Sequence, residues 1–350
     1  MTRTVLISGA SGVTGRALAA RLSADPDWRV LGLARRPERL PEGVAPVAAD
    51  LSDPAAARAA LAPHAEVTHL FHCAFDPRGT PAEQVAPNLA LLVNGVEALE
   101  AAGAPLAHVH LVEGTKWYGS HLGPFPTPAR EDDPRPMPPN FYHDQEDWLR
   151  ARRAAGAPWR WSACRPHAIC GFALGNPMNL AMAIAAYGAV CRELGLPMRF
   201  PGKPRAYDAL YQVCDARHLA EAMAWMATDP ACVDRPFNVV NGEPFRWRRL
   251  WPRLAALLGC EAGEPQTLPL KAWMADKAPL WERIVARHGL RPIPWAEIAD
   301  WGFAEFVWST EWDCVSSMLN ARQAGFHAVV DDEAMFARLF GEFRAAKIMP

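Results

Sequence analysis

The opening residues join an apolar strand to a run of regularly spaced glycines, and this pairing restricts the fold more than any other stretch. Residues 5–8 are apolar or small, Gly9, Gly12 and Gly15 follow, and residues 16–22 continue with helical spacing. The first glycine allows a tight turn, the second lets backbone approach a pyrophosphate, and the third lets the helix pack against the strand. The helix N-terminus offers N–H groups to phosphates. The predicted dinucleotide contacts in this turn are Gly9, Ser11, Gly12, Val13, Thr14 and Gly15.

The second expected strand, residues 29–34, ends in Arg35 and Arg36. A protein that prefers NAD usually carries a carboxylate about twenty residues after the glycines, where it binds the ribose hydroxyls. A guanidinium at that place can pair with a 2′-phosphate and stack on adenine. We therefore expect NADPH/NADP+ as the cofactor, the alternative being that the two arginines form a solvated basic pair that closes the strand.

Alternating strands and helices continue to residue 165. Further strands are expected at residues 44–49, 67–74, 107–112 and 159–165, with helices at residues 54–61 and 85–102. This order predicts right-handed βαβ units and hence an α/β fold, a Rossmann doubly wound parallel sheet. Because ligands of such sheets lie at the carboxyl ends of the strands, we expect Asp50 and Leu51 at the adenine edge and Cys73 and Ala74 beside the nicotinamide.

The character of the sequence changes after residue 175, where helical stretches alternate with short segments rich in Pro and Trp. We expect residues 1–175 to form the NADP-binding domain, with returning segments near residues 210–242. Residues 176–350 should form a smaller, mostly helical C-terminal substrate lobe, intertwined with the first domain. Tryptophans of this half are expected in the core of the lobe; they include Trp247, Trp251, Trp273 and Trp281.

Composition argues against several classes of partner. The net charge of −2 gives no general attraction to nucleic acid or anionic membranes. The first strand begins within a few residues of Met1, which leaves no room for a secretory signal. Eight cysteines show no metal-binding spacing and are expected as buried thiols in a reducing compartment. We expect a cytoplasmic protein without a metal, whose partner is a small molecule.

The residues available for catalysis depart from a common pattern. The glycine run, the strand order and Arg165-Pro166 resemble the extended branch of the short-chain dehydrogenase/reductase superfamily, which implies Tyr-x-x-x-Lys on the helix after strand five. Here the residue four positions after Tyr142 is Glu146, and a carboxylate there would raise the tyrosine pKa. Either the catalytic apparatus has decayed, or the lysine has moved to Lys116 on the loop after strand five, which also borders the nicotinamide ribose.

A narrower resemblance covers nearly the whole chain. Its motifs are Gly114-Thr115-Lys116-Trp117-Tyr118-Gly119, Gly123-Pro124-Phe125, Asn140-Phe141-Tyr142 with Glu146-Asp147, Arg165-Pro166 with Gly171-Phe172, Met178-Asn179-Leu180, Phe237-Asn238-Val239 with Asn241-Gly242, Trp247, Trp281-Glu282-Arg283-Ile284-Val285, Gly289-Leu290 and Lys347-Ile348-Met349-Pro350. In this order they are similar to the progesterone 5β-reductase/iridoid synthase-like family.

That resemblance implies NADPH-dependent 1,4-reduction of the activated C=C bond of enones and enals by a monomer or homodimer. It implies Lys116 and Tyr142 as catalytic residues that also contact the cofactor, and Arg35 or Arg36 as the ligand of the 2′-phosphate. Pro166 and Ile169, which follow strand six, complete the expected cofactor contacts. Phe125 and Cys314 are expected in the substrate pocket, where they depart from the family pattern: residues are inserted before Phe125, and Cys314 replaces a bulky aromatic.

The implied mechanism is hydride addition to the β-carbon, with the resulting enolate stabilised by Tyr142 and Lys116 and a proton reaching the α-carbon from solvent. Two other readings stay open. One is a carbonyl reductase, epimerase or dehydratase of the extended superfamily, which the missing Tyr-x-x-x-Lys weakens. The other is a non-catalytic NADPH sensor, in which Lys116 is a solvated loop residue and Tyr142 a core residue.

Overall fold

Seven strands form one parallel sheet in the order β11-β6-β5-β4-β1-β2-β3. The computed structural model describes residues 2–350. The strands are β1 (Arg3–Ser8), β2 (Trp28–Ala34), β3 (Ala45–Ala48), β4 (His69–His72), β5 (His108–Val112), β6 (Arg160–Pro166) and β11 (Arg235–Val239). The chain moves outward from β1 to β3 and returns to the other side of β1 with β4, so the strand order reverses beside β1. The predicted doubly wound Rossmann sheet is confirmed.

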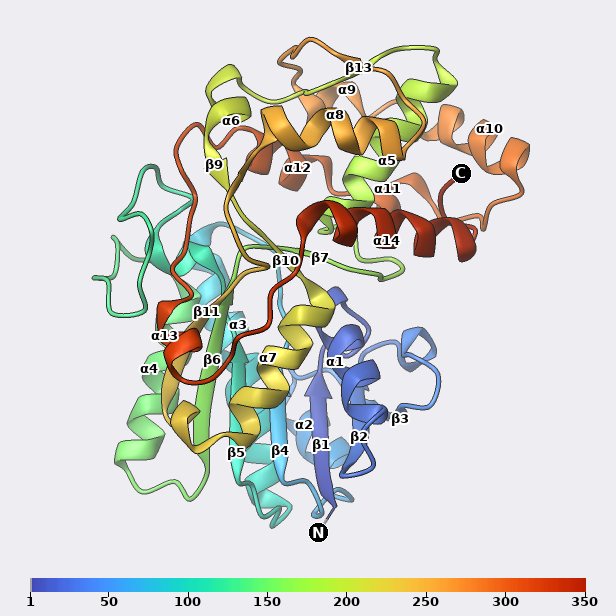
Figure 1. Cartoon of the computed structure of the whole chain (residues 1–350). Helices are drawn as coiled ribbons and strands as arrows, with labels where there is room; N and C mark the ends of the chain where they lie inside the picture. Colours follow the sequence, from blue (N-terminus) through green and yellow to red (C-terminus); the bar gives the residue numbers. More distant parts are fainter. Residues whose placement is uncertain (1) are drawn as a thin grey trace.

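Helices cover both faces of the sheet. Successive side chains of a strand point to opposite faces, and the side chains on both faces are largely apolar. Val5 and Ile7 share a core with α1 (Val13–Ser23) and α7 (Ala216–Thr228). Leu6 points to the opposite face, where the core is completed by α2 (Pro54–Leu61), α3 (Pro81–Ala101) and α4 (Phe141–Ala154). Figure 1 shows α1 and α7 side by side across the strands.

Helix α3 begins at Pro81 rather than at the expected residue 85. Thr80 and Glu83 form a capping box, in which the Thr80 hydroxyl accepts the Glu83 N–H and the Glu83 carboxylate accepts the Thr80 N–H. This reciprocal cap satisfies two backbone donors and fixes the helix start.

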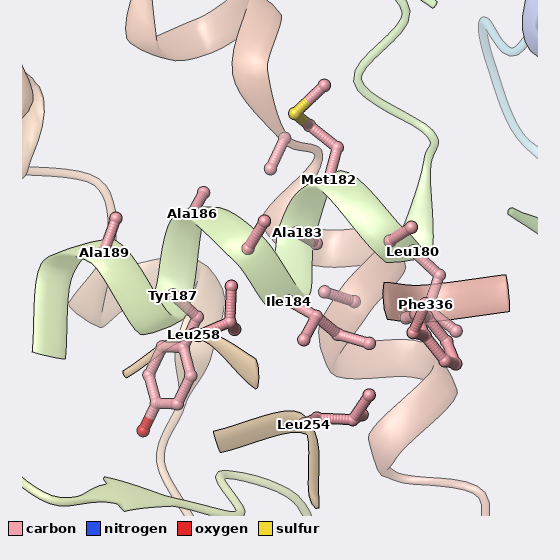
Figure 2. Packing of buried hydrophobic residues seen from close by; sticks show 14 of the residues in the cluster. Leu180, Met182, Ala183, Ile184, Ala186, Tyr187, Ala189, Leu254, Leu258 and Phe336 are labelled. Carbon is pink, nitrogen blue, oxygen red and sulfur yellow. The ribbon is translucent and has the colours of Figure 1, made fainter. Parts of the chain in front are cut away.

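The C-terminal lobe is built around α5 (Leu180–Glu193), in which every residue from Leu180 to Cys191 is buried. Leu254 of α8 (Trp247–Leu257), Leu258 just after it and Phe336 of α14 (Asp332–Ala345) pack around this helix (Figure 2). The other helices of the lobe are α6 (Pro204–Asp208), α9 (Leu270–Trp273), α10 (Ala278–His288), α11 (Trp295–Ile298) and α12 (Trp301–Trp308), whereas α13 (Leu319–Gln323) packs against β11 of the sheet. This lobe lies beyond the carboxyl ends of the strands (Figure 1).

Short elements connect these parts. They are the strands β7 (Ala168–Cys170), β8 (Met198–Arg199), β9 (Leu210–Tyr211), β10 (Val213–Asp215), β12 (Phe245–Arg246) and β13 (Ala262–Gly263), and the 3₁₀ helices η1 (Pro37–Arg39), η2 (Thr115–Tyr118) and η3 (Pro230–Cys232). Strand β11 and helix α7 return from the second half of the chain to the sheet, and so do Met318, Ala321 and Phe326. The proposed division at residue 175 stays a prediction.

Two expectations about burial need correction. Trp247, Trp251 and Trp281 lie in the lobe core, whereas Trp273 is 56% exposed, because the short helix α9 turns Leu270 inward instead. All eight cysteines are free, and six are buried, but Cys73 and Cys260 are partly exposed. None of the helices within residues 2–350 is long and apolar enough to cross a membrane.

Candidate functional site

The glycine-rich turn lies where the strand order reverses, between the ends of β1 and β4. Gly9 has a φ of +71°, and a Cβ on it would lie 2.8 Å from the Cys73 carbonyl oxygen and 2.9 Å from the Ala74 amide nitrogen. A Cβ on Gly15 would clash with the Gly9 carbonyl oxygen, so this position lets α1 sit close against the turn. The structure thus brings Cys73 and Ala74 directly against the turn, at the place where such sheets bind ligands.

The first turn of α1 faces the same edge of the sheet. Gly12 is its N-cap, and no side chain caps the helix. Val13 and Thr14 are buried, and Val13 packs against Ala173, so these two residues offer backbone rather than side-chain groups to a ligand. Ser11 is half-buried. Asn176, which sequence reasoning missed, places its Nδ2 3.2 Å from where a Gly12 Cβ would stand.

Arg35 and Arg36 are both exposed just beyond β2. The Arg35 charge contributes to lowering the pKa of Asp50, although the main cause is the hydrogen bond from the Ser52 N–H to that carboxylate. Leu51 is 3% exposed and packs in the core near Gly95. Its side chain therefore points away from the expected adenine edge.

Two more arginines lie at this end of the molecule. Arg16 Nη1 donates to the Arg39 carbonyl oxygen at 3.3 Å. Arg39 in turn pairs with Glu297 of α11 at 3.3 Å, which ties the segment after β2 to the C-terminal lobe. The sequence offered no signal for this ion pair, because the two residues are 258 positions apart.

Lys116 and Tyr142 come from different segments that one side chain joins. Lys116 lies in η2 and Tyr142 in the first turn of α4. The Asn140 amide Nδ2 donates to the Lys116 carbonyl oxygen at 2.7 Å, and its Oδ1 accepts the Tyr142 N–H at 3.2 Å. The Tyr142 hydroxyl lies 3.4 Å from where a Gly114 Cβ would stand, so a larger residue there would press on it. Asn140 therefore caps α4 and couples the two candidate catalytic residues.

The surroundings shift the pKa values of these two side chains in opposite directions. Burial, with a contribution from the Glu113 charge, raises the pKa of Tyr142, so its hydroxyl keeps its proton. The Lys116 side chain reaches the surface, but enough protein surrounds the ammonium to lower its pKa by desolvation. Its Nζ lies 5.5 Å from the ring centre of Phe306 on α12, so the side chain extends toward the C-terminal lobe.

Glu146, at the position expected for a lysine, does not act on Tyr142 in the way the sequence suggested. Its Oε2 accepts hydrogen bonds from Arg165 at 2.7 Å and from the Trp117 ring at 3.1 Å, and its Oε1 accepts from Arg150 at 2.8 Å. Burial opposes its ionisation, but the two arginines outweigh burial and lower the pKa of Glu146. The carboxylate is thus neutralised locally, and the nearby charge that raises the Tyr142 pKa is that of Glu113.

The remaining predicted residues surround the same end of β6. Pro166 is buried, with its carbonyl oxygen 3.6 Å from the place of a Gly114 Cβ, and Ile169 is half-buried beside Val13. Phe125 and Tyr142 pack against one small hydrophobic cluster, which consists of Trp117, Tyr118 and Ala129.

Cys314 is 4% exposed, so little of it is available to a ligand. Its sulfur lies 3.8 Å from Nδ1 of His167, whose other ring nitrogen is 2.8 Å from the Ser316 hydroxyl. Burial raises the pKa of the Cys314 thiol to about 12 and lowers that of His167 to about 3. Burial thus favours the neutral form of both side chains near pH 7.

Comparison with known proteins agrees with the resemblance seen in the sequence. A profile of the PRISE-like Rossmann-fold domain matches residues 48–350. The chain is 32% identical to short chain dehydrogenase gsfE of Penicillium aethiopicum, over 100% of both chains. It is 33% identical to (S)-8-oxocitronellyl enol synthase ISY1 of Nepeta cataria, with 99% of this chain and 92% of the relative covered. It is 32% identical to the 3-oxo-Delta(4,5)-steroid 5-beta-reductase of Arabidopsis thaliana, with the same coverage, 99% and 92%.

Solved structures show the same fold at lower identity. UDP-glucose 4-epimerase of Thermotoga maritima superposes with a TM-score of 0.70 at 15% identity, over 98% of this chain and 99% of that one. RMD of Pseudomonas aeruginosa, solved with NADPH, gives a TM-score of 0.58 at 20% identity, over 77% and 86%. From the profile match and the full-length relatives, the chain belongs to the PRISE-like family of Rossmann-fold proteins and is an NAD(P)-dependent oxidoreductase.

Proposed function

We propose that this protein uses NADPH to reduce the activated C=C bond of a small enone or enal. The observation that carries the proposal is the Asn140 bridge, which holds the Lys116 loop and the Tyr142 helix together at the carboxyl edge of the sheet. The two joined segments carry a cation and a hydroxyl donor, and such groups suit a reaction in which negative charge develops on a carbonyl oxygen.

The residues present fit a dinucleotide with a 2′-phosphate. The turn at Gly9 and Gly12 leaves room that a Cβ would fill, and the first turn of α1 has no side-chain cap to compete with a phosphate. Arg35 and Arg36 would hold the 2′-phosphate, since both are exposed and no carboxylate takes their place. When bound, NADPH would supply the hydride.

Tyr142 and Lys116 would act on the carbonyl end of the substrate. Because burial raises the Tyr142 pKa, the hydroxyl stays protonated and donates a hydrogen bond to the oxygen on which charge develops. Lys116 adds positive charge near the same oxygen. The α-carbon then takes its proton from solvent, so neither residue needs to transfer its own.

The name of one relative gives an enone substrate, a 3-oxo-Delta(4,5)-steroid, and that of another gives an enol product, 8-oxocitronellyl enol, the kind of species formed by hydride addition to an enal. They support an enone or enal as the substrate class. The epimerases share only the fold at this identity and give no support to the alternative of sugar-nucleotide chemistry.

The test is NADPH oxidation with 2-cyclohexen-1-one, 8-oxogeranial, progesterone and a saturated aldehyde as control, with products identified by mass. We expect a saturated ketone or aldehyde from at least one of the unsaturated substrates. In Tyr142→Phe, the loss of one stabiliser of developing charge should lower kcat on the order of 10²-fold or more; Lys116→Ala should behave similarly. An allylic alcohol product would indicate carbonyl reduction instead, and tight NADPH binding without turnover of any substrate would indicate a sensor.

A further inference from the structure

Arg165 lies at the centre of a buried set of contacts around the proposed catalytic pair. Its side chain is 0% exposed. Its Nε donates to Glu113 at 2.7 Å, Nη2 donates to Glu146 at 2.7 Å, and Nη1 donates to the Tyr118 hydroxyl at 3.1 Å. Its guanidinium carbon lies 3.5 Å from the ring centre of Trp117, so the plane is stacked as well as hydrogen-bonded.

These partners are sequence neighbours of the two candidate catalytic residues. Trp117 and Tyr118 directly follow Lys116 in η2, and Glu113 ends the β5 segment that leads into it. Glu146 lies one helical turn after Tyr142 on α4. One guanidinium near the carboxyl end of β6 therefore contacts both segments that carry the pair.

A second ring of contacts holds these partners in place. The Tyr118 hydroxyl donates to Asn238 Oδ1 at 2.7 Å, and the Asn238 N–H donates to Glu131 at 2.7 Å. Arg165 Nη1 also donates to the Glu131 carbonyl oxygen at 3.1 Å. Since Asn238 belongs to β11, the arrangement is anchored to two adjacent strands of the sheet.

The chemistry of arginine suits this place better than that of lysine. A guanidinium presents donors in a fixed planar fork and stacks on aromatic rings, whereas an ammonium is a compact point charge. Glu146 is a buried carboxylate whose charge Arg165 helps to compensate, and removing this partner leaves that charge less compensated. A lysine at residue 165 would keep one positive charge but could not reproduce the stacking and the separate bonds to Glu113, Glu146 and Tyr118.

We propose that Arg165 is a positioning residue for the proposed reduction: its guanidinium fixes η2 relative to α4, so that Lys116 and Tyr142 meet at one carbonyl oxygen. The inference rests on the proposed function. It adds a residue that contacts neither substrate nor cofactor but decides whether the two that do are correctly placed.

The test compares Arg165→Lys with Arg150→Met in the full-length protein. Arg150 also pairs with Glu146, but on its outer side, and is 49% exposed, so it serves as the matched control. We expect Arg165→Lys to lower kcat on the order of 10²-fold, because small displacements of catalytic groups cost that much, with NADPH affinity within about threefold of wild type. Arg150→Met should keep the wild-type kcat. Equal loss of kcat in both variants, or wild-type kcat in Arg165→Lys, would overturn the proposal.

Two further measurements separate positioning from general stability. Tyr118→Phe removes one hydroxyl from the contacts and should lower kcat by a smaller factor, about 3- to 10-fold. In a Lys116→Ala background, Arg165→Lys should lower kcat only slightly further, because the effects of substitutions in residues that act as one unit are strongly non-additive. Additive losses would show that Arg165 acts elsewhere.

Hydrogen exchange tests the proposal without turnover. In Arg165→Lys, amides of residues 113–122 should exchange faster than in wild type while those of α5 do not change. Unchanged exchange at residues 113–122 would refute the inference even if no enone proved to be a substrate. A wild-type enzyme that reduces no enone would refute the proposed function alone.

Discussion

Glu146 alone restricts how catalytic groups can be arranged on α4. A carboxylate bound by Arg165 and Arg150 occupies the place one turn after Tyr142, so this helix cannot supply a cation there. In the proposed site the cation comes from Lys116 on a separate segment, and Asn140 links that segment to α4. We therefore expect activity to depend more on contacts between segments than it would if both groups stood on one helix.

Cofactor preference should depend on the arginines after β2. In the double variant Arg35→Ala/Arg36→Ala, KM for NADPH should rise by about 10- to 100-fold, because the loss of one or two hydrogen bonds to a charged group has an effect of this size. KM for NADH should change little, because NADH has no 2′-phosphate. Steady-state kinetics with both cofactors measures the ratio, and each single variant shows which arginine matters. Equal increases in KM for NADPH and NADH would mean that these arginines do not bind the 2′-phosphate.

The Glu113 carboxyl should make stability depend on pH. Burial raises its pKa from the ordinary 4.5 to about 8, against the opposing effect of Arg165. The folded state therefore keeps a proton that the unfolded chain loses, and the stability gained is lost as pH rises through about 8. Glu113→Gln should abolish this part of the decline, so that its stability relative to wild type improves by about 1–3 kcal/mol between about pH 5 and pH 9. Urea unfolding of both proteins at the two pH values measures the difference. An equal change in the free energy of unfolding of wild type and Glu113→Gln would contradict the prediction.

Local signals explain which site residues could be predicted from sequence. Gly9 and Gly15 follow from turn geometry within a few residues, and the structure shows the close approaches that require them. Asn176 and Arg39 make their contacts with partners distant in the sequence, near Gly12 and at Glu297, so no spacing in the sequence indicates them. The Leu51 side chain packs in the core, and its contact with adenine stays a prediction.

At the scale of elements, β4 and β5 bring several histidines into the sheet core. His69, His72, His108 and His110 are all buried, and desolvation lowers their pKa values. His72 has a pKa of about 4, and its Nδ1 lies 3.0 Å from the Ser8 hydroxyl. The strands thus accept these side chains only in the neutral form.

We expect this burial to make the protein acid-sensitive. Between about pH 6.5 and pH 4 the unfolded chain binds protons that the folded histidines exclude, so stability falls as pH decreases through this window. His72→Asn keeps a polar atom near Ser8 but removes one titrating ring, and the decline should become shallower by about 1 kcal/mol or more. Denaturant unfolding at pH 7 and at about pH 5 checks this. A slope equal to that of wild type would show that His72 is accessible to protons in the folded state.

The elements that the sequence predicted best carry their own boundary signals. Helix α2 has the expected bounds, residues 54–61, because the Asp53 side chain caps it by accepting two backbone N–H groups. Helices α11 and α12 were not predicted, since they are short and form where Trp295 and Trp301 pack together. Their existence depends on tertiary contacts that a local pattern does not contain.

At the scale of the whole molecule, Gly171 lets the segment after β7 approach both α1 and α7, which come from opposite halves of the sequence. A Cβ there would lie 2.6 Å from the Ala216 Cβ of α7 and 2.8 Å from the Val13 Cγ1 of α1. Gly171→Ala should destabilise the fold by about 1–3 kcal/mol through overpacking, and should weaken NADPH binding because α1 begins at Val13. Gly341→Ala is the control: Gly341 is exposed on α14 with open space around it, and the substitution should stabilise the fold by about 0.5–1 kcal/mol. Thermal unfolding and NADPH titration test both variants, and a Gly171→Ala variant as stable as wild type would show that the segment after β7 can shift away from α1 and α7 freely.

The late return of the chain to the sheet has a consequence for biosynthesis. Strand β11 pairs with β6 only after residues 235–239 exist, and Met318, Ala321 and Phe326 complete the core beneath it. A ribosome releases the nucleotide-binding segment first, with the edge of β6 unpaired and one apolar face uncovered. Native folding must therefore wait until nearly the whole polypeptide has emerged. A product of premature termination would expose the same surfaces to chaperones, proteases or aggregation.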